Sequence, residues 1–270
     1  MRLVVKVGSS SLVGPDGWPD STVIGQLCLQ IRRLMAEAHE VVLVSSGAVA
    51  TGSALIGARS SNRSAQAAVG QAHLMGVYRR FLGTRSIAQV LVLKPDLEPQ
   101  TPSPLRYTLE DLWAAGVLPV VNENDVVSRP DTELGENDRV AALLARLVQA
   151  DVLVLLSDVD GVYETLPGAR GPSRPLSRLD WTAIEALLEA SPESLAKGSS
   201  WGRGGMRSKL EAAMHVARDG IPTVIAHARQ PQVLLEVARF ASVGTWIGRP
   251  KPTSRPASAP CREEASHGIQ

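Results

Sequence analysis

The chain has 270 residues, of which 44% are hydrophobic, and a formal net charge of +1. This length and apolar content suit one large α/β domain or two small ones and exclude wholesale disorder. The near-neutral charge gives no basic field for nucleic acid, so we expect no nucleic-acid partner and expect anions to be held by locally placed cations and amides.

The two cysteines, Cys28 and Cys261, lie far apart and lack metal-ligand spacing, which favours a reducing compartment over a disulfide framework. Lys6 interrupts the first apolar run, which is too short for the core of a signal peptide. No stretch approaches the roughly 18–20 continuous apolar residues of a membrane span. These features predict a cytoplasmic protein without a membrane partner.

Short runs rich in Val, Leu and Ile recur along the chain, with helix-like segments between them. Continuously apolar runs are typical of strands covered on both faces and predict strands at 3–7, 41–44, 87–93, 118–121, 152–156 and 223–226. Apolar residues at helical spacing predict helices at 23–38, 65–81, 105–115, 139–149 and 206–218. The alternation predicts an α/β fold, a three-layer αβα sandwich with a mainly parallel central sheet.

No shift in composition divides residues 1–248, which we expect to form one domain. Residues 166–175 are rich in Pro, Gly and Arg and predict a surface loop. From residue 249 onward Pro, Ser and Arg dominate and the periodicity is lost, so residues 249–270 are expected to form a disordered tail.

Polar turns follow the first two predicted strands, at the sheet edge where parallel α/β proteins bind ligands. After the first strand, Gly8 allows close backbone approach to an anion, Ser9 adds a donor and Lys6 adds positive charge. After the second, Ser46 and Gly47 leave room for a ligand at a helix start. Ordinary strand–turn punctuation remains an open alternative for each turn alone. Neither turn matches G-x-x-x-x-G-K-[ST], which excludes a P-loop.

Two dense clusters of amides and acids, Asn122-Glu123-Asn124-Asp125 and Gly135-Glu136-Asn137-Asp138, lie close together in the sequence. Such groups can bind the ammonium of an amino acid or orient catalytic lysines. Asp138 alone could equally be a charge that stabilises a helix N-terminus. The two clusters together favour a functional site.

Two further segments are candidates for binding a nucleotide. Ser157-Asp158 follows the fifth predicted strand, where an acid could contact a ligand or only shape the turn. The segment from Trp201 to Lys209 carries glycines and cations at the start of a helix, which favours an anion site over a flexible linker.

These motifs, in this order, resemble the amino-acid kinase superfamily and, within it, the glutamate 5-kinases. The resemblance covers about residues 1–248 and rests on Lys6-Val7-Gly8-Ser9-Ser10, Ser45-Ser46-Gly47-Ala48, Ala68-Val69-Gly70-Gln71, Asn122-Glu123-Asn124-Asp125, Gly135-Glu136-Asn137-Asp138, Ser157-Asp158 and Gly204-Gly205-Met206-x-x-Lys209. It implies transfer of the ATP γ-phosphoryl group to the side-chain carboxylate of L-glutamate. The product would be L-glutamyl 5-phosphate, in the first step of proline biosynthesis.

The resemblance also implies a role for each matched residue. The catalytic set would be Lys6, Asp138 and Lys209. The residues that bind the acceptor would be Ser46, Gly47, Asp125 and Asn137. The nucleotide would contact Lys6, Gly8, Ser9, Ser157, Asp158, Arg203, Gly204, Gly205, Met206, Ser208 and Lys209. Mg²⁺ would be bound through the ATP phosphates, with no metal ligand from the chain.

Several departures from the family pattern leave the acceptor open. Arg203 replaces a usual threonine, Glu136 replaces a usual aspartate, and residues 96–107 lack the usual lead into their helix. The common C-terminal RNA-binding-like domain has no counterpart in the sequence. The alternatives are a kinase of the same fold acting on a glutamate analogue or another small acid, and a non-catalytic nucleotide or amino-acid sensor. The family further implies a homo-oligomer, dimer or tetramer, and functional coupling to a glutamyl-phosphate reductase.

Overall fold

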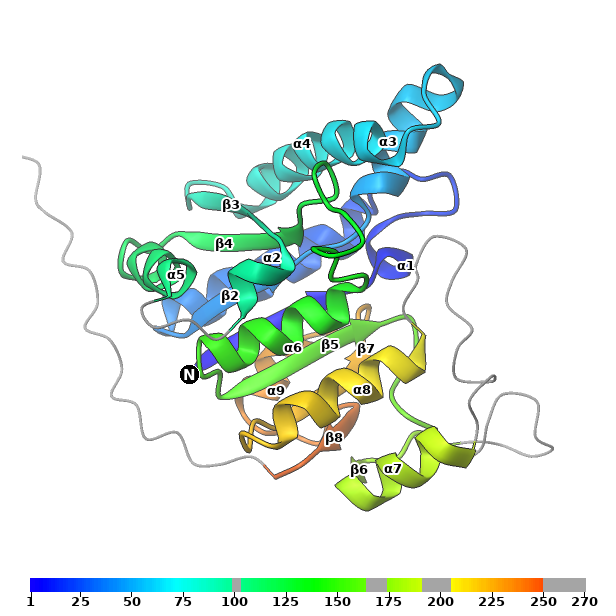
Figure 1. Cartoon of the computed structure of the whole chain (residues 1–270). Coiled ribbons are helices and arrows are strands. Elements are labelled where there is room, and N and C mark those ends of the chain that lie inside the picture. Colours follow the sequence, from blue (N-terminus) through cyan, green and yellow to red (C-terminus); the bar gives the residue numbers. More distant parts are fainter. Residues whose placement is uncertain (99–102, 164–173, 191–204, 250–270) are drawn as a thin grey trace, which may run out of the picture.

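A single mixed sheet forms the middle layer of the computed structural model, with helices on both of its faces (Figure 1). The structure describes residues 1–98, 103–163, 174–190 and 205–249. Within these residues the sheet has eight strands, in the order β3-β4-β2-β1-β5-β7-β8-β6. Their bounds are β1 Arg2–Val7, β2 Glu40–Val44, β3 Ile87–Val92, β4 Leu118–Glu123, β5 Val152–Ser157, β6 Arg178–Leu179, β7 Thr223–His227 and β8 Thr245–Ile247.

The neighbouring strands β3, β4, β2, β1, β5 and β7 are mutually parallel, so their carboxyl ends meet at one edge of the sheet. β8 pairs antiparallel with β7, and the short β6 runs parallel to β8. β1 and β5 are neighbours, but β2 lies beyond β1 on one side and β7 beyond β5 on the other. Such a reversal of strand order is the place where open α/β sheets bind ligands.

Two groups of helices cover the sheet and enclose two separate cores (Figure 1). One face carries α2 (Ser21–Ala36), α3 (Ala48–Ile56), α4 (Arg63–Leu82) and α9 (Val233–Ala238). The other carries α5 (Pro104–Ala114), α6 (Asn137–Leu147), α7 (Trp181–Ala190) and α8 (Met206–Ala217). The short helices are α1 (Ser9–Leu12), η1 (Gly57–Arg59) and η2 (Lys94–Leu97). None of the helices in the described residues combines the length and apolar character that a membrane crossing requires.

The alternation of side chains along β1 assigns Lys6 to a definite layer. Leu3, Val5 and Val7 belong to the core beneath α2, α4 and α9, whereas Val4 belongs to the core beneath α6 and α8. Successive side chains of a strand point to opposite faces. Lys6 therefore lies on the same face as Val4, beneath α6 and α8.

Two glycines allow α3 and α4 to touch backbone to backbone. A Cβ added at Gly52 would lie 1.7 Å from the carbonyl oxygen of Gln66, and one at Gly70 would lie 1.8 Å from that of Ala48. No side chain fits at either distance, so both positions require glycine. Because Ala48 begins α3, the contact places α4 against the turn that follows β2.

The predicted αβα sandwich is confirmed, as are all the predicted strands and helices, each within two residues at either end; for example, 118–121 was expected and Leu118–Glu123 is found. The sequence did not predict α3, α7, α9, the short helices α1, η1 and η2, or the short strands β6 and β8. β6 and β8 span only two and three residues, too few to show a period. Most of the expected loop, 166–173, and of the expected tail, 250–270, lies outside the described residues.

Candidate active site

Three charged side chains from three elements meet at the carboxyl edge of the sheet. Nζ of Lys6, on β1, lies 2.7 Å from Oδ1 of Asp138, on α6. Nζ of Lys209, on α8, lies 3.2 Å from Oδ2 of the same carboxylate. The three residues are only 5%, 1% and 4% exposed in that order, so the cluster is buried.

The fold explains why these residues meet. The alternation along β1 turns Lys6 toward α6 and α8, and Asp138 lies in the first turn of α6. Lys209 lies one turn into α8, where Ser208 donates a hydrogen bond to Oδ2 of Asp138 at 2.7 Å. Asp138 is thus both a first-turn acid, as its position alone suggested, and the shared partner of two lysines.

Opposing effects set the ionisation of the cluster. Burial acts to raise the pKa of Asp138, but the charges of Lys6 and Lys209 and the hydrogen bond from Ser208 outweigh it and lower this pKa to about 2. Burial lowers the pKa of Lys6 from its ordinary 10.5, and the charge of Asp138 opposes that shift. The carboxylate of Asp138 therefore favours the charged form of Lys6, against the effect of burial.

A cluster of side-chain amides lies beside the charged residues. The two N–H groups of Asn137 Nδ2 are shared among three acceptors: the carbonyl oxygen of Ser45 at 2.9 Å, Oγ of Ser46 at 3.0 Å and Oδ1 of Asn122 at 2.9 Å. Nδ2 of Asn122 in turn donates to Oε1 of Gln71, on α4, at 3.0 Å. The cluster ties the ends of β2 and β4 to the start of α6, and it brings together the predicted acceptor residues Ser46 and Asn137.

Gly47 and Asp125, the other predicted acceptor residues, lie at the same edge. Gly47 caps α3 with φ of +90°, and a Cβ there would lie 2.5 Å from Cγ2 of Val13. The half-buried Asp125 follows β4, and its backbone N–H donates to the carbonyl oxygen of Glu123 at 3.0 Å.

The buried carboxylate of Glu123 organises the excursion between β4 and α6. Its Oε1 accepts from the backbone N–H of Leu134 at 2.6 Å and from Oγ of Ser128 at 3.3 Å. These bonds close residues 124–134 into a loop over the end of β4. Glu123 therefore holds the segment that carries Asp125.

The predicted nucleotide residues surround the ends of β1 and β5. The backbone N–H of Gly8 donates to the carbonyl oxygen of Leu156 at 3.1 Å, which joins the turn before Ser9 to the end of β5. Oγ of Ser157 donates to Oδ1 of the exposed Asp158 at 3.1 Å. The remaining described members lie at the start of α8, namely Gly205, Met206, Ser208 and Lys209. Arg203 and Gly204 lie outside the described residues.

Asn122, Glu123 and Gln71 belong to the site although they were not among the individually predicted site residues. Asn122 and Glu123 fall within a motif that the sequence did single out, so position in that motif was the available signal. Gln71 ends the motif Ala68-Val69-Gly70-Gln71, on which the family resemblance also rests, but no role was predicted for it. Its side chain reaches Asn122 because α4 packs closely on α3, and local sequence patterns do not predict that packing.

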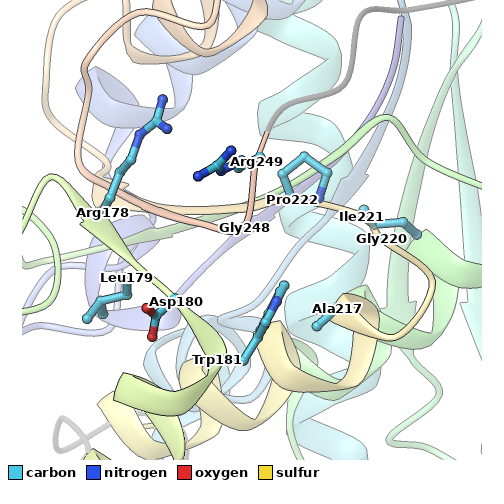
Figure 2. A pocket seen from close by; sticks show the side chains of 10 residues that line it. All are labelled: Arg178, Leu179, Asp180, Trp181, Ala217, Gly220, Ile221, Pro222, Gly248 and Arg249. Atoms are coloured by element: carbon cyan, nitrogen blue, oxygen red, sulfur yellow. The ribbon is translucent and has the colours of Figure 1, made fainter.

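A cavity of about 540 Å³ lies elsewhere, at the opposite end of the strands (Figure 2). Its lining includes Ala217, which ends α8, and Pro222, which precedes β7, so it opens at the amino end of β7. Trp181 points into it between Asp180 and Ala217 (Figure 2). It contains none of the predicted site residues.

The comparisons with known proteins agree with this geometry. The family model described as the amino acid kinase family matches residues 1–227. The glutamate 5-kinase of Gloeobacter violaceus is 39% identical, over 94% of this chain and 70% of that protein. The glutamate 5-kinase of Thermus thermophilus is 39% identical, over 91% of this chain and 67% of that protein.

Solved structures share the fold at much lower sequence identity. A carbamate kinase from Giardia lamblia bound to AMP-PNP has a TM-score of 0.65 and 17% identity, over 92% of this chain and 98% of that one. A UMP kinase from Bacillus anthracis has a TM-score of 0.62 and 14% identity, over 92% of this chain and 95% of that one. These likenesses show the fold. The family match and the curated relatives show that the chain belongs to the amino acid kinase family and, within it, to the glutamate 5-kinases.

Proposed function

We propose that this protein transfers the γ-phosphoryl group of ATP to the side-chain carboxylate of L-glutamate, giving L-glutamyl 5-phosphate, as the first step of proline biosynthesis. The observation that carries the proposal is the buried cluster of two lysines on one aspartate, Lys6, Lys209 and Asp138. The activity named for the curated relatives supports the same reaction.

Phosphoryl transfer depends on positioning and on neutralising the charge of the moving group. A carboxylate is already ionised at neutral pH, so the reaction requires no general base. The carboxylate oxygen of the acceptor attacks the γ-phosphorus, and the bond from that phosphorus to the bridging oxygen of ADP breaks. Lys6 and Lys209 would lie on either side of the transferring group and stabilise the charge on its oxygens.

Asp138 would act as the positioning group for both lysines. Its carboxylate contacts Lys6 through one oxygen and Lys209 through the other, which fixes the two ammonium groups relative to each other. It also opposes the loss of charge that burial imposes on Lys6. The acid would remain ionised throughout, since its pKa is held at about 2.

The amide cluster and the turn after β2 would bind the amino-acid acceptor. Ser46, Gly47 and Asn137 lie together at the end of β2, where Asn137 donates to Ser46. Asp125 would contribute a carboxylate suited to the substrate ammonium. This arrangement would direct the side-chain carboxylate of the substrate toward Lys6 and Lys209.

The nucleotide would lie over the ends of β1 and β5, against Gly8, Ser9, Ser157 and Asp158. It would also contact Gly205, Met206, Ser208 and Lys209 at the start of α8. Arg203 and Gly204, which we also propose as nucleotide contacts, lie outside the described residues. Mg²⁺ fits this arrangement as an ion held by the phosphates, because the central carboxylate, Asp138, is already engaged by two ammonium groups and a hydroxyl. Bound there, Mg²⁺ would neutralise phosphate charge.

The test is an assay of the purified chain with ATP, Mg²⁺ and a panel of acids, with hydroxylamine present to trap acyl phosphate as the hydroxamate. We expect glutamyl hydroxamate to form in an ATP-dependent manner and kcat/KM for glutamate to exceed that for every other acid. Absence of product with millimolar glutamate would refute the proposal. Higher kcat/KM for another small acid would retain the reaction and change the acceptor.

Other expectations stay predictions. We propose residues 1–248 as the kinase domain. We further propose a cytoplasmic location, on the sequence features given above, and assembly into a homo-oligomer (a dimer or a tetramer) and coupling to a glutamyl-phosphate reductase, on the family resemblance. Size measurement in solution and co-purification with a reductase test the last two.

A further inference from the structure

Three side-chain amides form a chain that runs from α4 to the predicted acceptor site. Oε1 of Gln71 accepts from Nδ2 of Asn122 at 3.0 Å, and Oδ1 of Asn122 accepts from Nδ2 of Asn137 at 2.9 Å. Gln71 is 6% exposed and Asn122 is 2% exposed, so the chain of amides is largely shielded from water.

Backbone groups fix the orientation of both asparagine amides. Nδ2 of Asn137 donates to the carbonyl oxygen of Ser45, a group that can only accept. Oδ1 of Asn122 accepts at 2.9 Å from the backbone N–H of Glu123, a group that can only donate. Neither amide can be turned over without breaking such a bond. Gln71 must therefore face Asn122 with its oxygen, and its Nε2 must point elsewhere.

This orientation leaves one amide donor and one amide acceptor without a hydrogen bond. Within the part of the chain that the structure describes, Nε2 of Gln71 and Oδ1 of Asn137 are buried and have no hydrogen-bond partner. They are the only amide atoms in that condition among the described residues. Burying an unpaired amide costs free energy, so this pair is suited to a ligand that offers both an acceptor and a donor. The carboxylate and ammonium of an α-amino acid are such groups.

The contact between α3 and α4 places Gln71 at the acceptor site. Gly70 approaches the carbonyl oxygen of Ala48 so closely that a Cβ would lie 1.8 Å from it. Gln71 is the next residue, and Ala48 directly follows Ser46-Gly47. The side chain of Gln71 thus enters the amide cluster from the α4 side, while Lys6 and Lys209 meet Asp138 from β1 and α8.

We propose that Gln71 is a further substrate-binding residue, whose Nε2 donates to the α-carboxylate of the acceptor while Oδ1 of Asn137 accepts from its α-ammonium. The inference rests on the proposed function and deepens it. The reacting carboxylate must reach the phosphoryl group between Lys6 and Lys209. The carboxylate held at the amide cluster is therefore the other one, on the α-carbon.

Two substitutions at Gln71 test this contact. Gln71→Met removes both the donor and the oxygen toward Asn122, whereas Gln71→Glu keeps an oxygen toward Asn122 and removes the donor. We expect KM for glutamate to rise at least about tenfold in both variants, the loss of roughly one hydrogen bond to a charged group. KM for ATP should stay within about twofold, because a substrate contact at the amide cluster does not touch the nucleotide.

Gln30 on α2 provides a matched control. It is a buried glutamine, 7% exposed, but both ends of its amide are paired: Nε2 donates to the carbonyl oxygen of Gln26 at 3.3 Å and Oε1 accepts from the backbone N–H of Leu234 at 2.9 Å. Gln30→Met should lower the unfolding temperature and leave both KM values unchanged.

The inhibition constant of 4-aminobutyrate, which lacks the α-carboxylate, gives a second readout. It should be the same in the wild type and in Gln71→Met, because the lost contact is one this compound cannot make. An unchanged KM for glutamate in Gln71→Glu overturns the inference, as does an equal rise of KM for glutamate and ATP. If the proposed function itself fails, the wild type forms no glutamyl hydroxamate, before any variant is compared.

Discussion

At the scale of single residues, Lys209 tests the role of the charged cluster. Lys209→Met keeps most of the side-chain volume and removes an ammonium that contacts Asp138 at 3.2 Å. A charge that acts mainly in the transition state affects kcat, so we expect kcat to fall by roughly 10²–10³-fold, with a smaller change in KM for ATP. Steady-state kinetics with both substrates measures this.

The control for that variant is Arg146→Met. Arg146 is an exposed cation on α6 whose side chain pairs with Asp219 at the surface. Its removal should leave kcat unchanged. A Lys209→Met enzyme that folds and retains the wild-type kcat would contradict the role assigned to Lys209.

The pKa of Asp138 predicts a dependence of stability on pH. This pKa is about 2 in the folded chain, against an ordinary value of 3.8. A carboxyl whose pKa is lowered by folding stabilises the protein above its unfolded pKa, and this stabilisation is lost as the pH falls through the folded pKa. Wild type and Asp138→Asn should therefore differ less in free energy of unfolding at pH 2 than at pH 5, by on the order of 2 kcal/mol. Denaturant titrations measure this, and a difference independent of pH would contradict it.

The sequence placed Lys6, Asp138 and Lys209 in one site through motif resemblance, and the structure brings them into contact. The sequence included Gln71 in a family motif but could not assign a role to its side chain, because that role depends on which end of the amide faces Asn122. Amide orientation is decided by backbone groups such as the carbonyl of Ser45, which come from distant parts of the chain.

At the scale of elements, the crossing of α3 and α4 predicts opposite effects for two glycines on α4. Gly70→Ala would drive a methyl group into the carbonyl of Ala48 and push the helices apart. We expect it to destabilise the fold by about 1–3 kcal/mol and, because Gln71 moves with α4, to raise KM for glutamate. Thermal unfolding and kinetics measure the two effects.

Gly76→Ala, on the same helix, is the matched control. A Cβ at Gly76 meets nothing within 4 Å, so the alanine should stabilise the protein by roughly 0.5–1 kcal/mol through helix propensity alone. Equal effects of the two substitutions would show that the close crossing does not constrain α4.

Element prediction succeeded where a buried strand is a continuous apolar run, as in β1, or where a helix carries apolar residues at helical spacing, as in α2. It failed for α3, whose residues Ala48–Ile56 are mostly small and apolar and give no clear polar face. Small residues suit that position because α4 lies directly against it. The need for them comes from tertiary packing, which local patterns do not report.

At the scale of the whole molecule, the sheet topology assigns function to one edge. The charged cluster lies at the carboxyl edge, while the cavity that contains Trp181 lies at the amino end of β7. Trp181→Ala should therefore leave kcat and both KM values within about twofold, whatever it does to stability. Loss of activity in a folded Trp181→Ala variant would contradict the assignment of the active site to the carboxyl edge of the sheet.

The alternation of strands with helices along the chain sufficed to predict a mainly parallel sheet with two helical layers. It could not predict that β8 pairs antiparallel with β7. Thr245–Ile247 has only three residues, so its own sequence does not determine the direction in which it pairs. The family resemblance depended on several motifs in a fixed order. No single motif was sufficient, since each turn taken alone has an ordinary structural explanation.

We propose that an acceptor carboxylate attacks ATP between Lys6 and Lys209. The most direct measurement uses glutamate labelled with ¹⁸O in its side-chain carboxylate, with hydroxylamine to cleave the acyl phosphate at its carbon. We expect the released phosphate to carry one ¹⁸O atom, because the oxygen joining carbon to phosphorus comes from glutamate. Phosphate without label would mean that water, not the carboxylate, attacks the γ-phosphorus, and would refute the proposed reaction.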